Sequence, residues 1–144
     1  MAVKRPRVAI VFDSENNAAQ KRERITTSME RVLRHGNFVL KAAFGFASKR
    51  LQRTYREYGI TNYSRNGRID TQKNIADMRI CKYAKEHYRE FDCLVIVSDD
   101  NDFTPLLTFL KEKGKRVVVY GTQKVGRMLL CESNEYYELR KVCQ

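Results

Sequence analysis

Short apolar runs alternate with segments of helical periodicity along this chain. The runs that predict strands are Val8–Phe12, Phe38–Phe46, Cys93–Val97 and Arg116–Tyr120, with shorter candidates at Ile60–Tyr63 and Glu135–Leu139. Each is too short for a buried helix, and most are rich in β-branched or aromatic residues, which is typical of strands.

Residues spaced three and four apart predict helices between these runs. The four helical faces comprise Ile25, Met29, Val32 and Leu33; then Leu51, Tyr55 and Tyr58; then Met78, Cys81, Ala84, Lys85 and Tyr88; and finally Phe103, Leu106, Leu107 and Leu110. Gly59 and Gly114 follow the second and fourth faces and are expected to end those helices. Ser64–Gln72 is expected to be a polar loop, and a short helix is expected after Gly126.

This alternation predicts an α/β fold with three layers, α/β/α, in which helices cover both faces of a mainly parallel central sheet. We find no linker and no internal repeat, so we expect a single domain over residues 1–144 with a basic tail at residues 1–6. In such folds, ligands bind beyond the carboxyl ends of the strands.

The composition is strongly basic, which favours a partner that is a polyanion. The chain has 28 Lys and Arg against 17 Asp and Glu, a net charge of +11, which favours nucleic acid as a partner. No apolar run is long enough to cross a membrane or to serve in a signal peptide. We therefore expect a cytoplasmic location. The four cysteines lack the spacing of zinc or redox motifs, so reduced thiols are expected in that compartment.

Acidic residues follow two of the predicted strands directly. Asp13 follows Val8–Phe12, and an acidic group that includes Asp99, Asp100 and Asp102 follows Cys93–Val97. If these two strands are neighbours, their carboxylates converge at one edge of the sheet. Clustered carboxylates are the hard oxygen ligands that Mg²⁺ or Mn²⁺ prefers.

Asp77 shares a predicted helical face with Cys81 and Ala84, which puts a carboxylate beside the buried surface. A buried carboxylate needs a metal ion, a cation or strong hydrogen bonds. Lys73, four residues earlier, offers an ion pair as an alternative to a metal. Asn101 or Asp102 offers a helix cap as an alternative role.

The charge balance sharpens the metal hypothesis. If six carboxylates converge, the rest of the chain carries 28 positive and 11 negative charges, or +17. These six are Asp13, Glu15, Asp77, Asp99, Asp100 and Asp102. A cluster of carboxylates in an otherwise strongly basic protein is typical of a metal site that cleaves phosphodiesters.

Four segments carry a resemblance to a known family. They are VAIVFDSEN at residues 8–16, KNIADM at 73–78, LVIVSDDNDFTPL at 94–106 and GKRVVVYG at 114–121. In order and spacing they resemble the NYN family of PIN-like nucleases, particularly the NYN domains of LabA-like and LOTUS-associated bacterial proteins. The resemblance covers nearly the whole chain.

The resemblance implies a PIN-like (Rossmannoid) fold and a ribonuclease that depends on Mg²⁺ or Mn²⁺. It assigns catalytic and metal-binding roles to Asp13, Asp77, Asp100 and Asp102, with Asn16, Ser98 and Thr104 in support. RNA, single-stranded or structured, is the implied substrate. Basic residues expected to hold its backbone are Lys49, Arg50, Arg65, Arg68 and Lys73.

Other functions stay open at this point. Many members of the family carry a second Asp six residues after the helix Asp, where this chain has Tyr83, so a domain that binds RNA without cutting it is the main alternative. A phosphorelay receiver also gathers aspartates on a parallel sheet, but the double Asp here follows a later strand. An adhesion-type metal site would need Asp-x-Ser-x-Ser, which residues 13–16 lack. A homodimer is left open.

Overall fold

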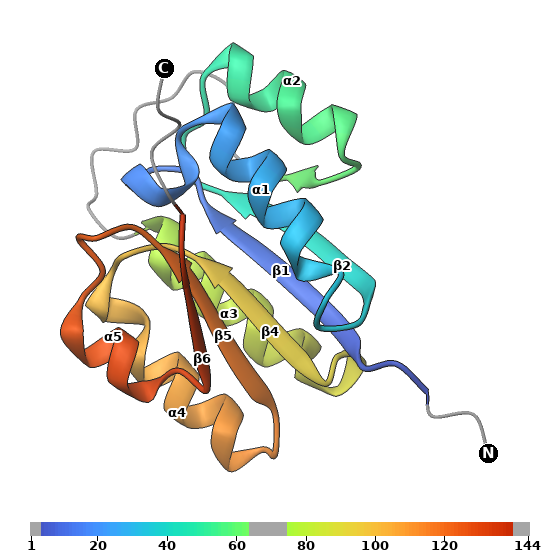
Figure 1. Ribbon diagram of the computed structural model, residues 1–144, viewed down its shortest axis with the longest axis vertical. Coiled ribbons are helices and arrows are strands. Elements are labelled where there is room, and N and C mark those ends of the chain that lie inside the picture. Colours follow the sequence, from blue (N-terminus) through green and yellow to red (C-terminus); the bar gives the residue numbers. More distant parts are fainter. Residues whose placement is uncertain (1–3, 64–74, 140–144) are drawn as a thin grey trace.

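The computed structural model describes residues 4–63 and 75–139, which alternate between strands and helices (Figure 1). The strands are β1 (Arg7–Asp13), β2 (Asn37–Phe44), β3 (Thr61–Asn62), β4 (Cys93–Val97), β5 (Arg116–Gly121) and β6 (Glu135–Glu138). The helices are α1 (Arg22–Val32), α2 (Lys49–Glu57), α3 (Ile75–His87), α4 (Thr104–Glu112) and α5 (Arg127–Glu132), with 3-10 turns η1 (Asn17–Ala19), η2 (Tyr88–Glu90) and η3 (Asn101–Phe103).

The six strands form one sheet in the order β3-β2-β1-β4-β5-β6, and every neighbouring pair is parallel. β1 therefore lies in the middle, between β2 and β4. Its register with β4 pairs Val8 with Cys93 and Phe12 with Val97. The predicted adjacency of these two strands is confirmed, and their carboxyl ends reach the same edge of the sheet.

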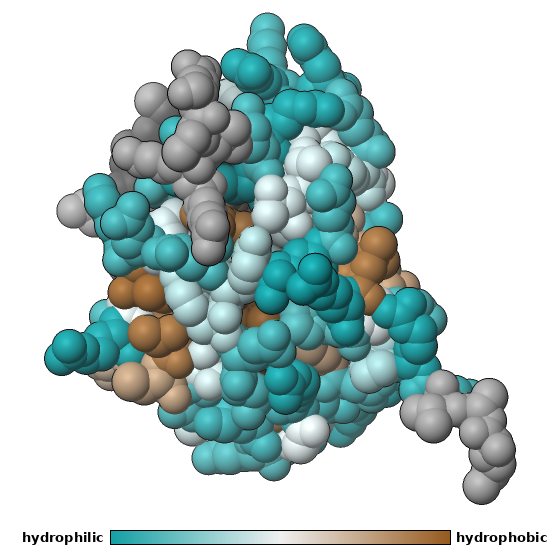
Figure 2. Space-filling view, in the orientation of Figure 1, coloured by the Kyte–Doolittle hydropathy of each residue, from teal (hydrophilic) through white to brown (hydrophobic). Residues whose placement is uncertain are grey.

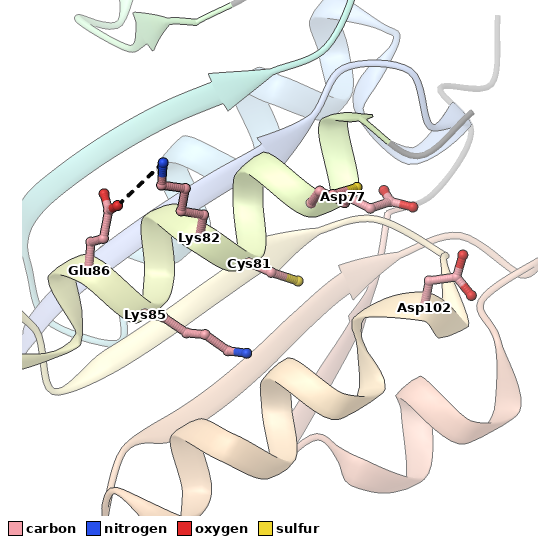
Figure 3. A pocket seen from close by; sticks show the side chains of 7 residues that line it. Asp77, Cys81, Lys82, Lys85, Glu86 and Asp102 are labelled. Atoms are coloured by element: carbon pink, nitrogen blue, oxygen red, sulfur yellow. Dashed lines mark ion pairs between the residues drawn. The ribbon is translucent and has the colours of Figure 1, made fainter. Parts of the chain in front are cut away.

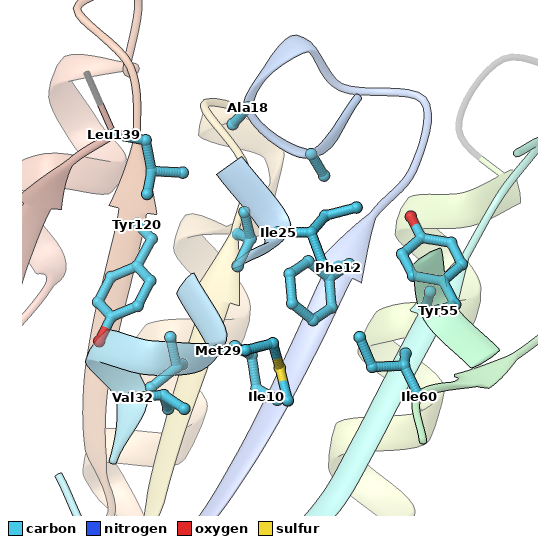
Figure 4. Packing of buried hydrophobic residues seen from close by; sticks show 14 of the residues in the cluster. Ile10, Phe12, Ala18, Ile25, Met29, Val32, Tyr55, Ile60, Tyr120 and Leu139 are labelled. Atoms are coloured by element: carbon cyan, nitrogen blue, oxygen red, sulfur yellow. The ribbon is translucent and has the colours of Figure 1, made fainter. Parts of the chain in front are cut away.

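Side chains alternate between the two faces of the sheet, as the pleat of a strand requires. In β1, Ile10 and Phe12 pack under α1 and α2, where the core also includes Ile25 and Tyr55 (Figure 4). Ala9 and Val11 point to the opposite face. That face is covered by α3, α4 and α5, which contribute Ile80, Leu107 and Leu129 among others. The predicted three-layer α/β/α fold is confirmed.

The structure corrects the predicted face of α3. Ile80 and Ala84 are fully buried on this helix, but Met78 is 70% exposed and Lys85 is exposed. Tyr88 lies beyond α3, in the turn η2. The buried face of α3 runs through Ala76, Ile80 and Ala84, and the predicted face did not include Ala76 or Ile80.

The predicted ends of two helices are confirmed. Gly59 follows α2 with a φ of 67°, and Gly114 follows α4 with a φ of 77°, both in the left-handed region that glycine adopts without strain. The predicted loop over residues 64–72 lies outside the described residues. Within the described part of the chain, no helix has both the length and the apolar character needed to span a membrane.

Candidate metal centre

Three aspartates from three separate elements meet at the carboxyl edge of the sheet. Carboxylate oxygens of Asp13, Asp77 and Asp100 all lie within 4.8 Å of one another. Asp13 is the last residue of β1 and follows the alternation of Ala9 and Val11, so it points to the face that α3 covers. Asp77 comes from the first turn of α3, and Asp100 follows β4.

Ser98 connects two of these aspartates. Its hydroxyl donates a hydrogen bond to Asp13 Oδ2 (3.1 Å) and accepts one from the backbone N–H of Asp100 (3.2 Å). Asn16 Oδ1 accepts hydrogen bonds from the backbone N–H groups of Ala18 (3.0 Å) and Asp99 (3.1 Å). The loops after β1 and β4 are thereby tied to each other, which fixes the positions of Asp13 and Asp100.

The environment of the cluster resists negative charge. Burial raises the pKa of Asp13 to about 6, and the Asp100 carboxylate adds to the shift although the Ser98 hydroxyl opposes it. Burial also raises the pKa of Asp77 to about 7, with further contributions from the charges of Asp13 and Asp100. Carboxylates crowded in this way gain stability when a cation shares them.

The residues present fit a divalent metal ion. Among the described residues, none of the three aspartates forms an ion pair with a Lys, Arg or His side chain. The charge that they concentrate therefore has no compensating partner there, and three carboxylate oxygens are suited to Mg²⁺ or Mn²⁺. Thr104 Oγ1, four residues after Asp100, is buried and has no hydrogen-bond partner in the described part of the chain.

Two carboxylates that the sequence grouped with this cluster have other partners. Asp99 turns toward β5, where its oxygens accept hydrogen bonds from the backbone N–H (2.6 Å) and the hydroxyl (2.5 Å) of Thr122. Glu15 accepts a hydrogen bond from the backbone N–H of Phe46 (3.3 Å) and is exposed. Of the six carboxylates supposed to converge, these two therefore do not belong to the group formed by Asp13, Asp77 and Asp100.

Asp102 occupies a position next to the cluster rather than within the group of three. It is exposed and lies across from Asp77 at one end of a groove along α3, close enough for its charge to help raise the pKa of Asp77 (Figure 3). The predicted helix cap also differs. Asp100 Oδ1 accepts a hydrogen bond from the backbone N–H of Asp102 (2.8 Å) and caps η3, whereas Asn101 Oδ1 accepts one from Leu129 (3.1 Å).

Tyr83, at the position where the family resemblance leads us to expect an Asp, lies away from the cluster. Its ring packs against Phe44 (centroids 5.2 Å apart), Tyr63 (5.8 Å) and His87 (4.5 Å). Six residues of helix separate it from Asp77, about 9 Å along the axis and on another face. Position 83 therefore belongs to an aromatic cluster, defined by these four residues, on the flank of β2.

Two of the predicted basic residues lie beyond the carboxyl end of β2. Lys49 and Arg50, both exposed, begin α2 just beyond β2, and Arg50 lines a small pocket with the start of α1. Figure 2 shows a mostly hydrophilic surface with scattered apolar patches. Arg65, Arg68 and Lys73 lie outside the described residues, as does the alternative ion pair between Lys73 and Asp77.

The all-parallel sheet and the helices on both of its faces define a PIN-like, Rossmannoid α/β protein. A model of the NYN domain family matches residues 7–140, so the chain belongs to that family. A solved structure of a protein of unknown function from Vibrio parahaemolyticus RIMD 2210633 has the same fold, with a TM-score of 0.78 at 20% sequence identity over 97% of this chain and 96% of that chain. No curated protein matches the sequence. Membership of the NYN family indicates a nuclease-type function.

Proposed function

We propose that this protein is a ribonuclease that uses Mg²⁺ or Mn²⁺ to hydrolyse RNA phosphodiester bonds. The observation that carries the proposal is the group formed by Asp13, Asp77 and Asp100, whose carboxylate oxygens lie within 4.8 Å of one another. Among the described residues, no Lys, Arg or His side chain forms an ion pair with them. A protein that only bound RNA would gain nothing from carboxylates that repel phosphate. Family membership supports nuclease chemistry at this edge of the sheet.

Asp13, Asp77 and Asp100 would hold the ion, with Asp102 at its outer side. When bound, the ion would supply Lewis acidity that activates water and offsets charge developing on the phosphate. Ser98 keeps Asp13 oriented through its hydrogen bond, and the cap of η3 holds Asp100. Asn16 fixes the two strand-end loops relative to each other, so the ligands are preorganised.

The basic side chains would hold the RNA backbone around this acidic centre. Lys49 and Arg50 are exposed at the same edge of the sheet, and Arg65, Arg68 and Lys73 belong to the segment that leads into α3. Each phosphate contact releases counterions, so binding should weaken steeply with salt. The choice of RNA over DNA rests on the family resemblance.

The test is a cleavage assay on a mixed set of end-labelled RNAs and DNAs, with Mg²⁺, with Mn²⁺ and with EDTA. The parent protein is compared with Asp100→Asn and with Asp92→Asn. Asp92 pairs with Arg7 at the opposite edge of the sheet, so this control removes the same charge far from the cluster. We expect metal-dependent RNA cleavage by the parent and by Asp92→Asn, and loss of most cleavage by Asp100→Asn.

We expect Asp100→Asn to retain RNA binding, because removing a negative charge lowers repulsion of phosphate. Loss of cleavage with binding retained would show that the variant is impaired in the chemical step. Equal cleavage by the parent and by Asp100→Asn would overturn the proposal, since the activity would then come from another site or a contaminant. Binding without cleavage by any form, in either metal, would assign the domain to RNA binding alone.

A further inference from the structure

A buried hydrogen bond joins α2 to the chain just after β1. The hydroxyl oxygens of Ser14 and Tyr55 lie 2.7 Å apart, and either hydroxyl can donate. Ser14 is 1% exposed and Tyr55 is fully buried, with its ring beside that of Phe12 (centroids 6.1 Å apart, Figure 4). Because both side chains are buried, each hydroxyl relies on the other as its hydrogen-bond partner in the described part of the chain.

Ser14 directly follows Asp13, and the two side chains lie on opposite faces of the sheet. Asp13 points to the face that α3 covers, whereas Ser14 points to the face that α2 covers and reaches Tyr55 there. The backbone N–H of Ser14 also donates a hydrogen bond to the carbonyl oxygen of Phe44 in β2 (2.9 Å). The residue next to Asp13 is therefore held through its backbone by β2 and through its side chain by α2.

The turn that begins at Ser14 folds back on Asp13 in two places. The backbone N–H of Asn16 donates a hydrogen bond to the Asp13 carbonyl oxygen (3.0 Å), and the backbone of Glu15 forms one with the Asp13 carboxylate. A rotation of the Ser14 peptide groups would move the Glu15 donor relative to that carboxylate. The orientation of the Asp13 carboxylate consequently depends on where Ser14 is held.

The hydroxyl of Tyr55 is not needed to fill the core. Its ring packs in the layer between α2 and the sheet, where the ring of a phenylalanine would occupy the same space. Burying a hydroxyl costs free energy unless the group is hydrogen-bonded. Burial raises the pKa of Tyr55 to about 12, opposed by the Ser14 hydrogen bond and assisted by the charge of Asp13, so the hydroxyl stays protonated at neutral pH within electrostatic reach of Asp13.

We propose that Tyr55 is a positioning residue for the metal centre, which acts through Ser14 to fix the turn that presents the Asp13 carboxylate to the ion. The inference rests on the proposed function. Tyr55 is buried on the face of the sheet opposite to α3, so it contacts neither the ion nor the substrate. Ser98 orients the Asp13 carboxylate from β4, and Tyr55 holds the following turn from α2.

The first experiment measures the Mn²⁺ affinity of the full chain by isothermal titration calorimetry. Tyr55→Phe is compared with the parent and with Tyr58→Phe, which removes a hydroxyl that donates to Thr26 Oγ1 in α1 (2.9 Å). Each substitution deletes one hydroxyl hydrogen bond near α2 and keeps the ring, but only Tyr55 is bonded to the chain after β1. We expect Tyr55→Phe to weaken Mn²⁺ binding about 10-fold and Tyr58→Phe to bind Mn²⁺ as the parent does.

Thermal denaturation of the same proteins separates positioning from stability. Both variants should lose some stability, since each removes one hydrogen bond, and both should be folded at the temperature of the titration. A residue that only stabilised the fold would lower the Tm without changing the Mn²⁺ affinity of the folded protein.

The second experiment combines Tyr55→Phe with Ser14→Ala in a double-mutant cycle of Mn²⁺ affinity. Because Tyr55 acts through Ser14, Ser14→Ala should weaken Mn²⁺ binding by a similar factor. The double variant should then bind no more weakly than either single variant, whereas independent effects would multiply.

Three results would overturn the inference. These are a Mn²⁺ affinity of Tyr55→Phe equal to that of the parent, an equal loss of affinity in Tyr58→Phe, and losses from Tyr55→Phe and Ser14→Ala that multiply in the double variant. If the parent binds Mn²⁺ and Asp100→Asn does not while any of these holds, the inference fails and the proposed metal centre stands. If the parent binds no Mn²⁺, the proposed function has failed and the inference fails with it.

Discussion

Ser98 and Asp13 are 85 residues apart in the sequence, yet the Ser98 hydroxyl lies 3.1 Å from Asp13 Oδ2 and donates a hydrogen bond to it. Both are buried, and Ser98 also accepts a hydrogen bond from the backbone of Asp100. One hydroxyl therefore orients the Asp13 carboxylate on β1 and the loop that carries Asp100 after β4. The arrangement exists only because the two strands pair in parallel.

Replacing Ser98 with Ala should remove the hydroxyl donor that orients Asp13 from β4. Partners of this kind typically contribute 10- to 100-fold to metal affinity or activity, so we expect Ser98→Ala to lower metal-dependent cleavage by about 10-fold or more. Ser133→Ala removes a hydroxyl that bonds Leu130 at the end of α5 and serves as control. Equal activity of the two variants would contradict the role of Ser98.

In metal-free protein, Asp77 and Asp92 should contribute to the pH dependence of stability with opposite signs. Asp77 has a pKa raised from 3.8 to about 7, so its contribution to stability is present below its ordinary pKa and is lost as pH rises through about 7. Asp77→Asn should therefore raise the Tm at pH 8 with EDTA, on the order of 2–4 °C for a domain of this size, and change it little at pH 4.

Asp92→Asn should have the opposite effect on stability to Asp77→Asn at high pH. The Arg7 guanidinium holds the pKa of Asp92 below its ordinary value, so the contribution of Asp92 is present above that value and lost as pH falls. We expect Asp92→Asn to lower the Tm at pH 8. Thermal denaturation of the three proteins from pH 4 to pH 8 measures both effects, and a fall in Tm for Asp77→Asn at pH 8 would contradict the crowding of the three carboxylates.

Substitutions of the neighbouring residues Asp99 and Asp100 should have different effects: the first on the free energy of unfolding, the second on cleavage. Asp99 accepts two hydrogen bonds from Thr122, and an amide in its place can accept through one oxygen only. We expect Asp99→Asn to lower the free energy of unfolding by about 1.5–3 kcal/mol in urea titrations. Thr122→Val, which removes one of the two donors, should cost less. Asp100→Asn should instead abolish cleavage with a smaller change in stability.

Tyr83 is expected to act through packing. Its ring contacts Phe44, Tyr63 and His87, and a carboxylate at position 83 would lose these contacts without reaching the metal centre. We expect Tyr83→Asp to destabilise the protein by about 2 kcal/mol and to leave metal-dependent cleavage no higher than in the parent. Tyr83→Phe keeps the ring and should be close to neutral. A rise in cleavage by Tyr83→Asp would show that position 83 completes the metal centre.

Much of the fold follows from local pattern. The runs at Val8–Phe12 and Cys93–Val97 can be read as strands because buried parallel strands are almost wholly apolar. Because helices alternate with these strands along the chain, the connections between strands are crossovers and the sheet is parallel. Asp13 directly follows the first run, and Asp100 follows the second after Ser98 and Asp99, so the sequence also determined that carboxylates stand at strand ends.

Only the tertiary structure decided which carboxylates meet. Strand order is not a local property, and the placement of β4 beside β1 brings Asp13 and Asp100 together across 87 positions of sequence. Adjacent residues at a strand end point to opposite faces, so Asp100 joins Asp13 and Asp77 while Asp99 turns to Thr122. The pattern of residues could not assign these faces, because the rotation of each chain segment is fixed by packing of the whole sheet against its helices.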